Sequence, residues 1–356
     1  MCEITDKLVL LGICTEKAHA VFGGSIPDEY YHSLITDIDR VSDAGYDGLF
    51  VLAHNYLKSN ENSHYNIECR GFMGSSPVAY CCGLTQADPL RCDDDIPVFP
   101  ELFHGFYHSR RKLPFLLELG ALPAEEIMES VFYRELSQTD SKRTLYYTDN
   151  LQMLDLLEAE IGHKEESLLY DGSELSGYWL DVLNAYDAKT FKKKVLNLFP
   201  DFLFMDSSGL DLFIRLIQQK TLLNRRNLSR IFGILHNPGA IRNASHMLDL
   251  GIPFESTNSM DYIAYPEDIY GYIRNYLPEA DAIQLSLQLC LNRKDPDSNT
   301  MDMLISKGIP INIVRRIWKI DHLYSSVQCY AHAGEFLRLA WYFENYYDEY
   351  IKWFCS

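Results

Sequence analysis

Two stretches decide the fold that this sequence predicts: SHMLDLGIPFES at residues 245–256 and MDMLISKGIPINIV at residues 301–314. In both, an apolar segment with helical spacing leads to a glycine, and a short turn containing proline follows. Glycine adopts the left-handed conformation that closes many helices without a steric penalty. We therefore interpret Gly251 and Gly308 as the ends of two helices built on one pattern.

The same pattern recurs upstream, as PFLLELGALPAEE at 114–126 and more weakly as LDLLEAEIGHKEE at 154–166. Its glycines are unevenly spaced, so we expect an array of helical units with irregular insertions. Strand-like alternation is rare, and the fold class predicted is all-α, with an unrelated helical bundle or a mixed α/β fold as alternatives. Helical periodicity predicts helices at 31–44, 97–120, 150–161, 176–199, 209–219, 227–235, 241–250, 267–276, 281–291, 299–307 and 312–320.

A further segment, YNIECRGFMGSSPVAYCCGL at 65–84, leads through glycines into Ser76 and Pro77, which suit the N-cap and first position of a helix. This segment resembles the start of an ankyrin repeat, although the histidine of that motif is absent. LLELGALP, MLDLGIPF and LISKGIPI similarly resemble the second helix and glycine turn of such repeats. The resemblance covers about residues 30–315 and implies a degenerate ankyrin-like solenoid over residues 1–315.

The carboxyl-terminal segment, residues 316–356, is expected to form a separate helical element. From Ala333 to Phe354 its apolar side chains recur every three or four residues, as one buried helical stripe requires. It is interpreted as a cap over the last repeat or as a partner-binding element. Ligase-recruiting boxes that follow ankyrin arrays place Cys four residues after Leu, whereas Leu323 and Cys329 are six apart.

The charge balance argues against nucleic acid as the main partner. The chain has 32 Lys and Arg against 50 Asp and Glu, a formal net charge of −18. Phosphate neutralisation needs a basic surface, and an acidic chain supplies little of it. Residues 191–242 are richer in Lys and Arg than the rest, which could steer an acidic protein partner there.

The cysteines and the amino terminus predict an intracellular location. Nine cysteines without a regular spacing do not indicate a secreted disulfide framework. The amino terminus lacks the basic flank of a secretory signal, and no apolar run is long enough to span a bilayer. We expect a cytoplasmic protein, with the nucleus as an alternative, and no membrane partner.

Motifs that carry chemistry are missing from the sequence. There is no phosphate-binding glycine loop, zinc-protease motif or nucleophile elbow. The adjacent Cys81 and Cys82, and the pair His104 and His108, are interpreted as packed side chains rather than metal ligands. We therefore expect no metal, no cofactor and no catalytic residue.

These observations predict a non-enzymatic scaffold or adaptor that binds another protein. Aromatic and arginine side chains are favoured interface anchors. One alternative is a substrate adaptor that recruits ubiquitin-ligase components through residues 316–356; another is an enzyme of unrecognised family with a Cys/His pair or a pocket among its 24 tyrosines. The expected partner contacts are Tyr65, Phe72, Met73, Arg110, Arg111, Arg225 and Arg226.

Overall fold

The structure is a computed structural model, and it divides into two compact units. The first comprises Met1–Cys92, Phe99–Leu169 and Trp341–Ser356; the second comprises Asp93–Val98 and Tyr170–Ala340. The residues that the structure describes are 5–59, 66–91, 115–120, 143–147, 149–164, 207–219, 224–254, 260–291, 298–320 and 323–354.

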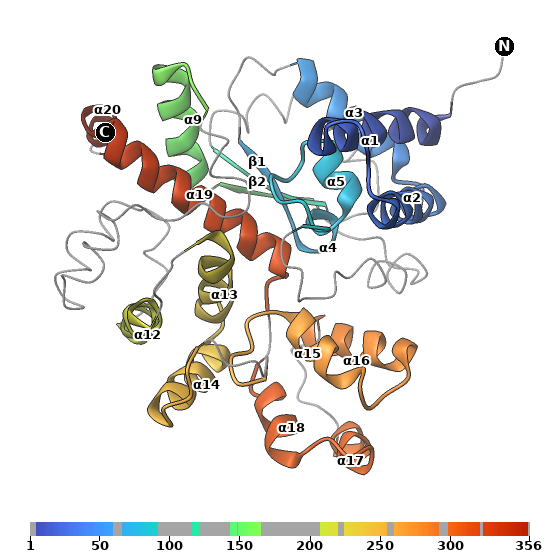
Figure 1. Ribbon diagram of the computed structural model, residues 1–356, viewed down its shortest axis with the longest axis vertical. Helices are drawn as coiled ribbons and strands as arrows, with labels where there is room; N and C mark the ends of the chain where they lie inside the picture. Colours follow the sequence, from blue (N-terminus) through green and yellow to red (C-terminus); the bar gives the residue numbers. More distant parts are fainter. Residues whose placement is uncertain are drawn as a thin grey trace. The chain divides into compact units, whose positions relative to one another are not determined.

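The first unit combines helices with a small sheet (Figure 1). The strands lie between helix α9 on one side and the amino-terminal helices on the other. The elements in chain order are α1 (Asp6–Phe22), α2 (Asp28–Asp43), α3 (Asp47–Ser59), β1 (Ile67–Arg70), α4 (Gly71–Gly74), α5 (Pro77–Cys81), β2 (Phe115–Leu119), β3 (Arg143–Tyr147), α9 (Asp149–Ile161) and α20 (Tyr347–Phe354).

The sheet has the order β1-β2-β3. Strand β1 pairs antiparallel with β2, and β2 pairs parallel with β3. Because side chains alternate between the faces of a strand, one face of β1 and β2 carries Ile67, Cys69, Leu117 and Leu119. These four side chains join a buried apolar core with α1, α2, α3 and α5.

Hydrogen bonds of two buried carboxyl groups connect α2 to the segment around α5. Ser76 caps α5 as predicted, since its Oγ accepts a hydrogen bond from the Val78 amide (3.1 Å) while donating to Asp37. The hydroxyl of Tyr30 donates to Asp88 (2.9 Å). Burial raises the pKa of Asp37 and of Asp88 to about 6, because it penalises the charged form more than these hydrogen bonds favour it.

The second unit is built from helices in the part of it that the structure describes. Asn237 caps α14 through its side chain, and Pro238 occupies the first helical position. Helix α19 begins in this unit and passes into the first at Trp341. The helices are α12 (Ser207–Gln218), α13 (Arg225–Leu235), α14 (Pro238–Asp249), α15 (Pro266–Ile273), α16 (Glu279–Leu291), α17 (Ser298–Ser306), α18 (Ile311–Ile317) and α19 (Ser326–Asn345).

The glycine-ended helices were predicted correctly in two of the three main copies. Gly251 and Gly308 follow α14 and α17 and have φ of 73° and 93°. The copy at 114–126 was wrong, because Phe115–Leu119 is strand β2 and Gly120 follows a strand. A short apolar run has no periodicity that separates a strand from a buried helix.

Most of the other predicted helices are present, and the chain is mostly helical where it is described. The carboxyl-terminal stripe is buried at Phe336, Leu339, Phe343 and Tyr350, although it is divided between α19 and α20. The described part of the chain shows no ankyrin repeat or solenoid. The predicted helix at 176–199, most of the one at 97–120, and the pair His104 and His108 lie outside the described residues.

The predicted boundary between residues 315 and 316 stays a prediction; it lies inside the second unit. Within the described ranges, no helix combines the length and apolar character that crossing a membrane requires.

Two glycines of the first unit provide a matched test of packing. A Cβ at Gly74 would lie 1.7 Å from the carbonyl oxygen of Cys69, whereas a Cβ at Gly12, inside α1, meets nothing within 4 Å. We expect Gly74→Ala to lower the free energy of unfolding by about 2 kcal/mol and Gly12→Ala to raise it by about 0.5–1 kcal/mol. Urea denaturation of both variants measures this, and equal effects would contradict the close approach.

Candidate functional site

The second face of the sheet carries two buried glutamates. Glu68 of β1 stands opposite Glu118 of β2, so both side chains leave the sheet on the same face. They are 3% and 1% exposed. Like charges directly opposite each other on neighbouring strands are destabilising, and a buried carboxylate needs compensation. This face is therefore polar where simple packing would favour apolar side chains.

Helix α9 adds two more buried carboxylates. Asp155 and Glu158 are three residues apart, which places them on one side of the helix, and both are buried. Gly120 permits close approach of α9 to the end of β2, since a Cβ there would lie 2.7 Å from Oδ2 of Asp155 and 2.8 Å from Cα of Gln152. The glycine thus brings the acidic side of α9 to the sheet.

Asn66, the residue before β1, joins these carboxylates and has no exposed surface. Its backbone amide and its Nδ2 both donate to Oδ1 of Asp155 (2.7 and 2.9 Å). The same Nδ2 donates to Oε2 of Glu158 (3.0 Å). An amide suits this position because its NH₂ group offers two donors toward two acceptors.

Gln86 and Tyr342 extend the network. The backbone amide of Gln86 donates to Oε1 of Glu68 (3.0 Å). The side-chain Nε2 of Gln86 donates to Oδ1 of Asn66 (3.0 Å). The Tyr342 hydroxyl lies 3.0 Å from the His163 carbonyl oxygen and 3.3 Å from Oε1 of Glu158, and shares its hydrogen between these two acceptors. We call the following set the carboxylate cluster: Glu68, Glu118, Asp155 and Glu158, with the amide side chains of Asn66 and Gln86.

The ligand chemistry of the carboxylate cluster is all oxygen. Carboxylate and amide oxygens are the donors that Mg²⁺, Mn²⁺ and Ca²⁺ prefer. Several buried carboxylates close together also favour a divalent cation, because it would offset their mutual repulsion. Asp155 and Glu158 each place an oxygen on the shared donor Nδ2 of Asn66, so two such oxygens lie close together here.

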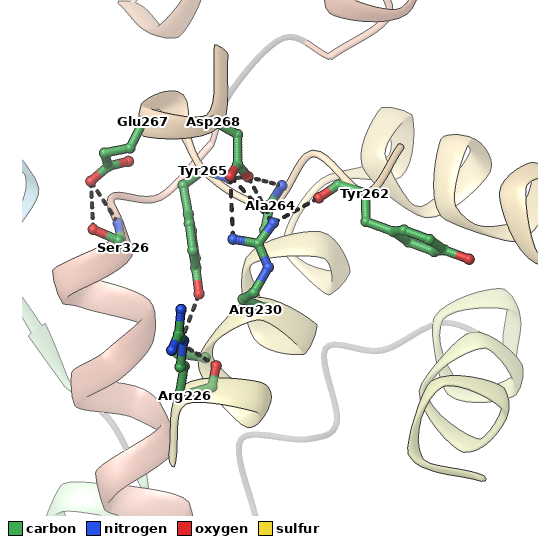
Figure 2. A network of polar contacts seen from close by, with 9 residues as sticks. Arg226, Arg230, Tyr262, Ala264, Tyr265, Glu267, Asp268 and Ser326 are labelled. Carbon is green, nitrogen blue, oxygen red and sulfur yellow. Dashed lines mark hydrogen bonds and ion pairs between the residues drawn. The ribbon is translucent and has the colours of Figure 1, made fainter. Parts of the chain in front are cut away.

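A second polar network lies in the other unit (Figure 2). Asp268, in the first turn of α15, accepts hydrogen bonds at Oδ2 from the backbone amides of Ala264 (2.8 Å) and Tyr265 (3.1 Å). Arg230 of α13 forms an ion pair with Asp268 at 3.2 Å. The Tyr265 hydroxyl lies 2.7 Å from Oγ of Ser229. These contacts join α13 to the start of α15.

Glu267 joins α15 to α19 in the same network (Figure 2). Its Oε1 accepts hydrogen bonds from the amide and the hydroxyl of Ser326 (2.9 and 2.7 Å), at the first residue of α19. Burial raises the pKa of Glu267 to about 7, against the lowering effect of these hydrogen bonds. Burial also raises the pKa of the nearby Cys329 thiol. Both groups are buried, so we interpret this network as structural.

The predicted partner-binding residues that the structure describes belong to two different compact units. Met73 is buried in the first unit. Arg225 is buried in the second, where Nε donates to the Tyr330 carbonyl (2.9 Å) and the guanidinium stacks 4.2 Å from that ring centre. Arg226 is half-buried on α13, and Phe72 belongs to α4. Tyr65, Arg110 and Arg111 lie outside the described residues. Their role as partner contacts stays a prediction.

Sequence reasoning missed the whole carboxylate cluster. A signal exists in hindsight: Glu68 and Glu118 interrupt the short apolar runs NIEC and FLLEL, and Asp155 and Glu158 stand among the leucines of α9. An acidic side chain inside an apolar run is buried only for a specific reason.

Comparison with known proteins gives a likeness to bacterial DNA polymerase III. A family model described as the bacterial DNA polymerase III alpha NTPase domain matches residues 9–142. The PolC-type DNA polymerase III of Caldanaerobacter subterraneus subsp. tengcongensis is 31% identical over 78 residues, or 22% of this chain. That of Lactococcus lactis subsp. lactis is 29% identical over 86 residues, or 24% of this chain. The matches cover 6% and 5% of those relatives' lengths.

These matches correct five predictions. The ankyrin resemblance was wrong, because the family model that matches describes a bacterial DNA polymerase III alpha NTPase domain. Two of the phrases that carried the resemblance are ordinary helix ends, and the one at 114–126 is a strand. The non-enzymatic scaffold was also wrong, since the relatives are enzymes. The matches also contradict the two alternatives, a ligase adaptor and an enzyme of unrecognised family. The prediction that nucleic acid is not a partner, which rested on the net charge, was also wrong, because net charge averages over the whole surface.

Proposed function

We propose that this chain contains a divalent-cation-dependent unit that acts on nucleoside triphosphates, of the DNA polymerase III alpha type, with its cation held by the carboxylate cluster. The main support is that half of the carboxylate cluster lies within the residues that the family model matches. Glu68 and Glu118 lie inside the matched residues 9–142, and Asp155 and Glu158 of the same compact unit complete the cluster. DNA is the partner that the relatives' names suggest.

A cation in the cluster would supply charge neutralisation for a phosphate group, as in phosphoryl-transfer enzymes generally. The chain's own residues would hold and orient it. Asn66 fixes the rotamers of Asp155 and Glu158 through its hydrogen bonds, and Gln86 does the same for Glu68. This support from a surrounding layer of amides is what keeps ligand oxygens in place in metal sites.

The variant Asp155→Asn tests this proposal. Asparagine keeps an Oδ1 that can accept both hydrogen bonds from Asn66, but it removes the charge that would bind a cation. We expect Mg²⁺ or Mn²⁺ to raise the melting temperature of the unaltered chain, with a stabilisation of about 2.7 kcal/mol at a hundred-fold excess over Kd. We expect no rise in Asp155→Asn, nor any nucleotide turnover that the unaltered chain shows on primed DNA.

The matched control is Asp39→Asn on α2, since Asp39 forms only a surface ion pair with Lys7 (2.9 Å) and is 55% exposed. Surface pairs contribute about 0–1 kcal/mol. Asp39→Asn should therefore respond to cations as the unaltered chain does. If millimolar Mg²⁺ and Mn²⁺ leave the melting temperature of the unaltered chain unchanged, the cluster is a purely structural polar core and the proposal is wrong.

A further inference from the structure

The carboxyl-terminal segment of the first unit, Trp341–Ser356, reaches the carboxylate cluster through the side chain of Tyr342. The Tyr342 hydroxyl lies 3.3 Å from Oε1 of Glu158 and 3.0 Å from the carbonyl oxygen of His163, just beyond the end of α9. Glu158 and Tyr342 are 184 residues apart in the chain. The fold of the first unit therefore brings a distant side chain to a member of the cluster.

The carboxylate of Glu158 is held at both of its oxygens. Oε2 accepts a hydrogen bond from Nδ2 of Asn66 (3.0 Å), and Oε1 faces the Tyr342 hydroxyl. A carboxylate with a donor at each oxygen loses one of these bonds if it rotates. Glu158 and Tyr342 have no exposed surface, so bulk water does not replace a lost bond. The two donors together fix the direction in which the carboxylate points.

The Tyr342 hydroxyl has a single hydrogen for its two acceptors. Hydrogen bonds to an ionised carboxylate are stronger than those to a neutral carbonyl. The hydrogen therefore favours Glu158 over the His163 carbonyl when Glu158 is charged. This preference makes Tyr342 a donor that responds to the charged form of the carboxylate, the form that binds a cation.

Packing against two neighbouring rings fixes the position of the Tyr342 hydroxyl. The Trp341 ring packs edge-on against the Tyr342 ring, with centroids 5.1 Å apart at an interplanar angle of 80°. The Tyr346 ring lies one turn further along, at 6.2 Å and 50°. The tyrosine ring has little freedom to turn its hydroxyl away from α9.

Helix α20 fastens the same segment to α9, and the two helices lie side by side (Figure 1). Glu160 of α9 accepts a hydrogen bond from the Lys352 ammonium (2.6 Å) and another from the indole N–H of Trp353. These contacts are on the surface, two residues beyond Glu158. The segment is thus attached to α9 at two places, once through Glu160 and once through the buried Tyr342.

We propose that Tyr342 is a positioning residue of the carboxylate cluster, whose hydroxyl orients Glu158 toward the cation. The segment Trp341–Ser356 is then part of the cation site, although it lies far outside the residues 9–142 that the family model matches. This inference rests on the proposed function, because it assigns Tyr342 a role in holding the cation of that function. Tyr342 acts through Glu158 and does not bind the cation itself.

Titration of the full chain with Mn²⁺, read by the electron paramagnetic resonance signal of the free ion, tests the inference. Tyr342→Phe keeps the ring and its packing and removes only the hydroxyl. We expect the Kd for Mn²⁺ to rise by about ten-fold or more, as loss of a group that orients a metal ligand does. The matched control is Tyr347→Phe, which should bind as the unaltered chain does, since Tyr347 is 54% exposed and its ring packs on Phe343 (5.2 Å).

A double-mutant cycle with Glu158→Gln separates positioning from packing. Glu158→Gln should itself weaken Mn²⁺ binding, because it removes the charge that Tyr342 orients. In that background Tyr342→Phe should change the Kd by less than about two-fold, since residues that act through one contact have non-additive effects. Circular dichroism and urea denaturation without cations check that each variant folds.

Three results would overturn the inference. If the unaltered chain shows no saturable Mn²⁺ binding, the proposed function and the role of Tyr342 are both wrong. If the unaltered chain binds Mn²⁺ and the folded Tyr342→Phe binds it equally well or more tightly, only the role of Tyr342 is wrong. If Tyr342→Phe weakens binding by the same factor with and without the Glu158 carboxylate, the hydroxyl acts through general packing and not through Glu158.

Discussion

Acidification from about pH 8 to about pH 5.5 is expected to raise the melting temperature of this protein. Three buried carboxyl groups carry the effect. Burial raises the pKa of Asp37 and Asp88 to about 6 and that of Glu267 to about 7. Each is held by neutral donors, Ser76, Tyr30 and Ser326 respectively, which do not offset the loss of solvation.

The sign follows from where protons bind. In the unfolded chain these groups titrate near their ordinary pKa of about 4. Between about pH 4 and pH 7 the folded state therefore binds more protons than the unfolded state, and the free energy of unfolding falls as pH rises. A pKa difference of two units corresponds to about 3 kcal/mol for each group. The stabilisation is complete below about pH 4 and is lost as pH rises through 6 to 7.

Neutral variants separate these groups from the general effect of the −18 net charge. Asp37→Asn and Glu267→Gln keep an acceptor oxygen for Ser76 and Ser326 but remove the titration. We expect a flatter dependence of melting temperature on pH in each, and Asp39→Asn on the surface should leave it unchanged. A melting temperature that is highest near pH 8 in the unaltered chain would show that the three carboxyl groups do not carry raised pKa values.

The helical part of the fold could be predicted because its signals are local. Helix starts are indicated by residues such as Ser76 before Pro77. Helix ends are indicated by Gly251 and Gly308, which follow apolar stripes. The sheet could not be predicted in this way. The run FLLEL of β2 is short and flanked by proline and glycine, and its partner β1 lies more than forty residues earlier in the chain.

The candidate site was missed for a related reason. Its members come from β1, β2, α9 and the turn at Gln86, and only the register Glu68 to Glu118 and the approach of α9 at Gly120 bring them together. Motif searches find ligands that are close in sequence. Asn66 and Asp155 are 89 residues apart, and an asparagine beside an aspartate carries no signal until the fold places them in contact.

Asn66→Asp is expected to be among the most destabilising single substitutions in the first unit. The Nδ2 of Asn66 donates to both Asp155 and Glu158, and all three residues are buried. Aspartate would place an oxygen there, so a donor toward two carboxylates becomes a third negative charge. Asn66→Ala removes the donor, which costs about 3 kcal/mol for a buried charged partner, and also the acceptor of the hydrogen bond from Gln86. We expect Asn66→Asp to exceed that loss, measured by urea denaturation without divalent cations.

Divalent cations distinguish a metal site from a polar core at this position. If the carboxylate cluster binds a cation, the new carboxylate of Asn66→Asp becomes an added oxygen ligand. Millimolar Mg²⁺ should then restore more stability to Asn66→Asp than to Asn66→Ala, because alanine offers no ligand. An equal response of the two variants would mean that residue 66 does not face a cation. A loss in Asn66→Asp no greater than in Asn66→Ala would mean that Asp155 and Glu158 are not both ionised, since only charged neighbours repel the added carboxylate.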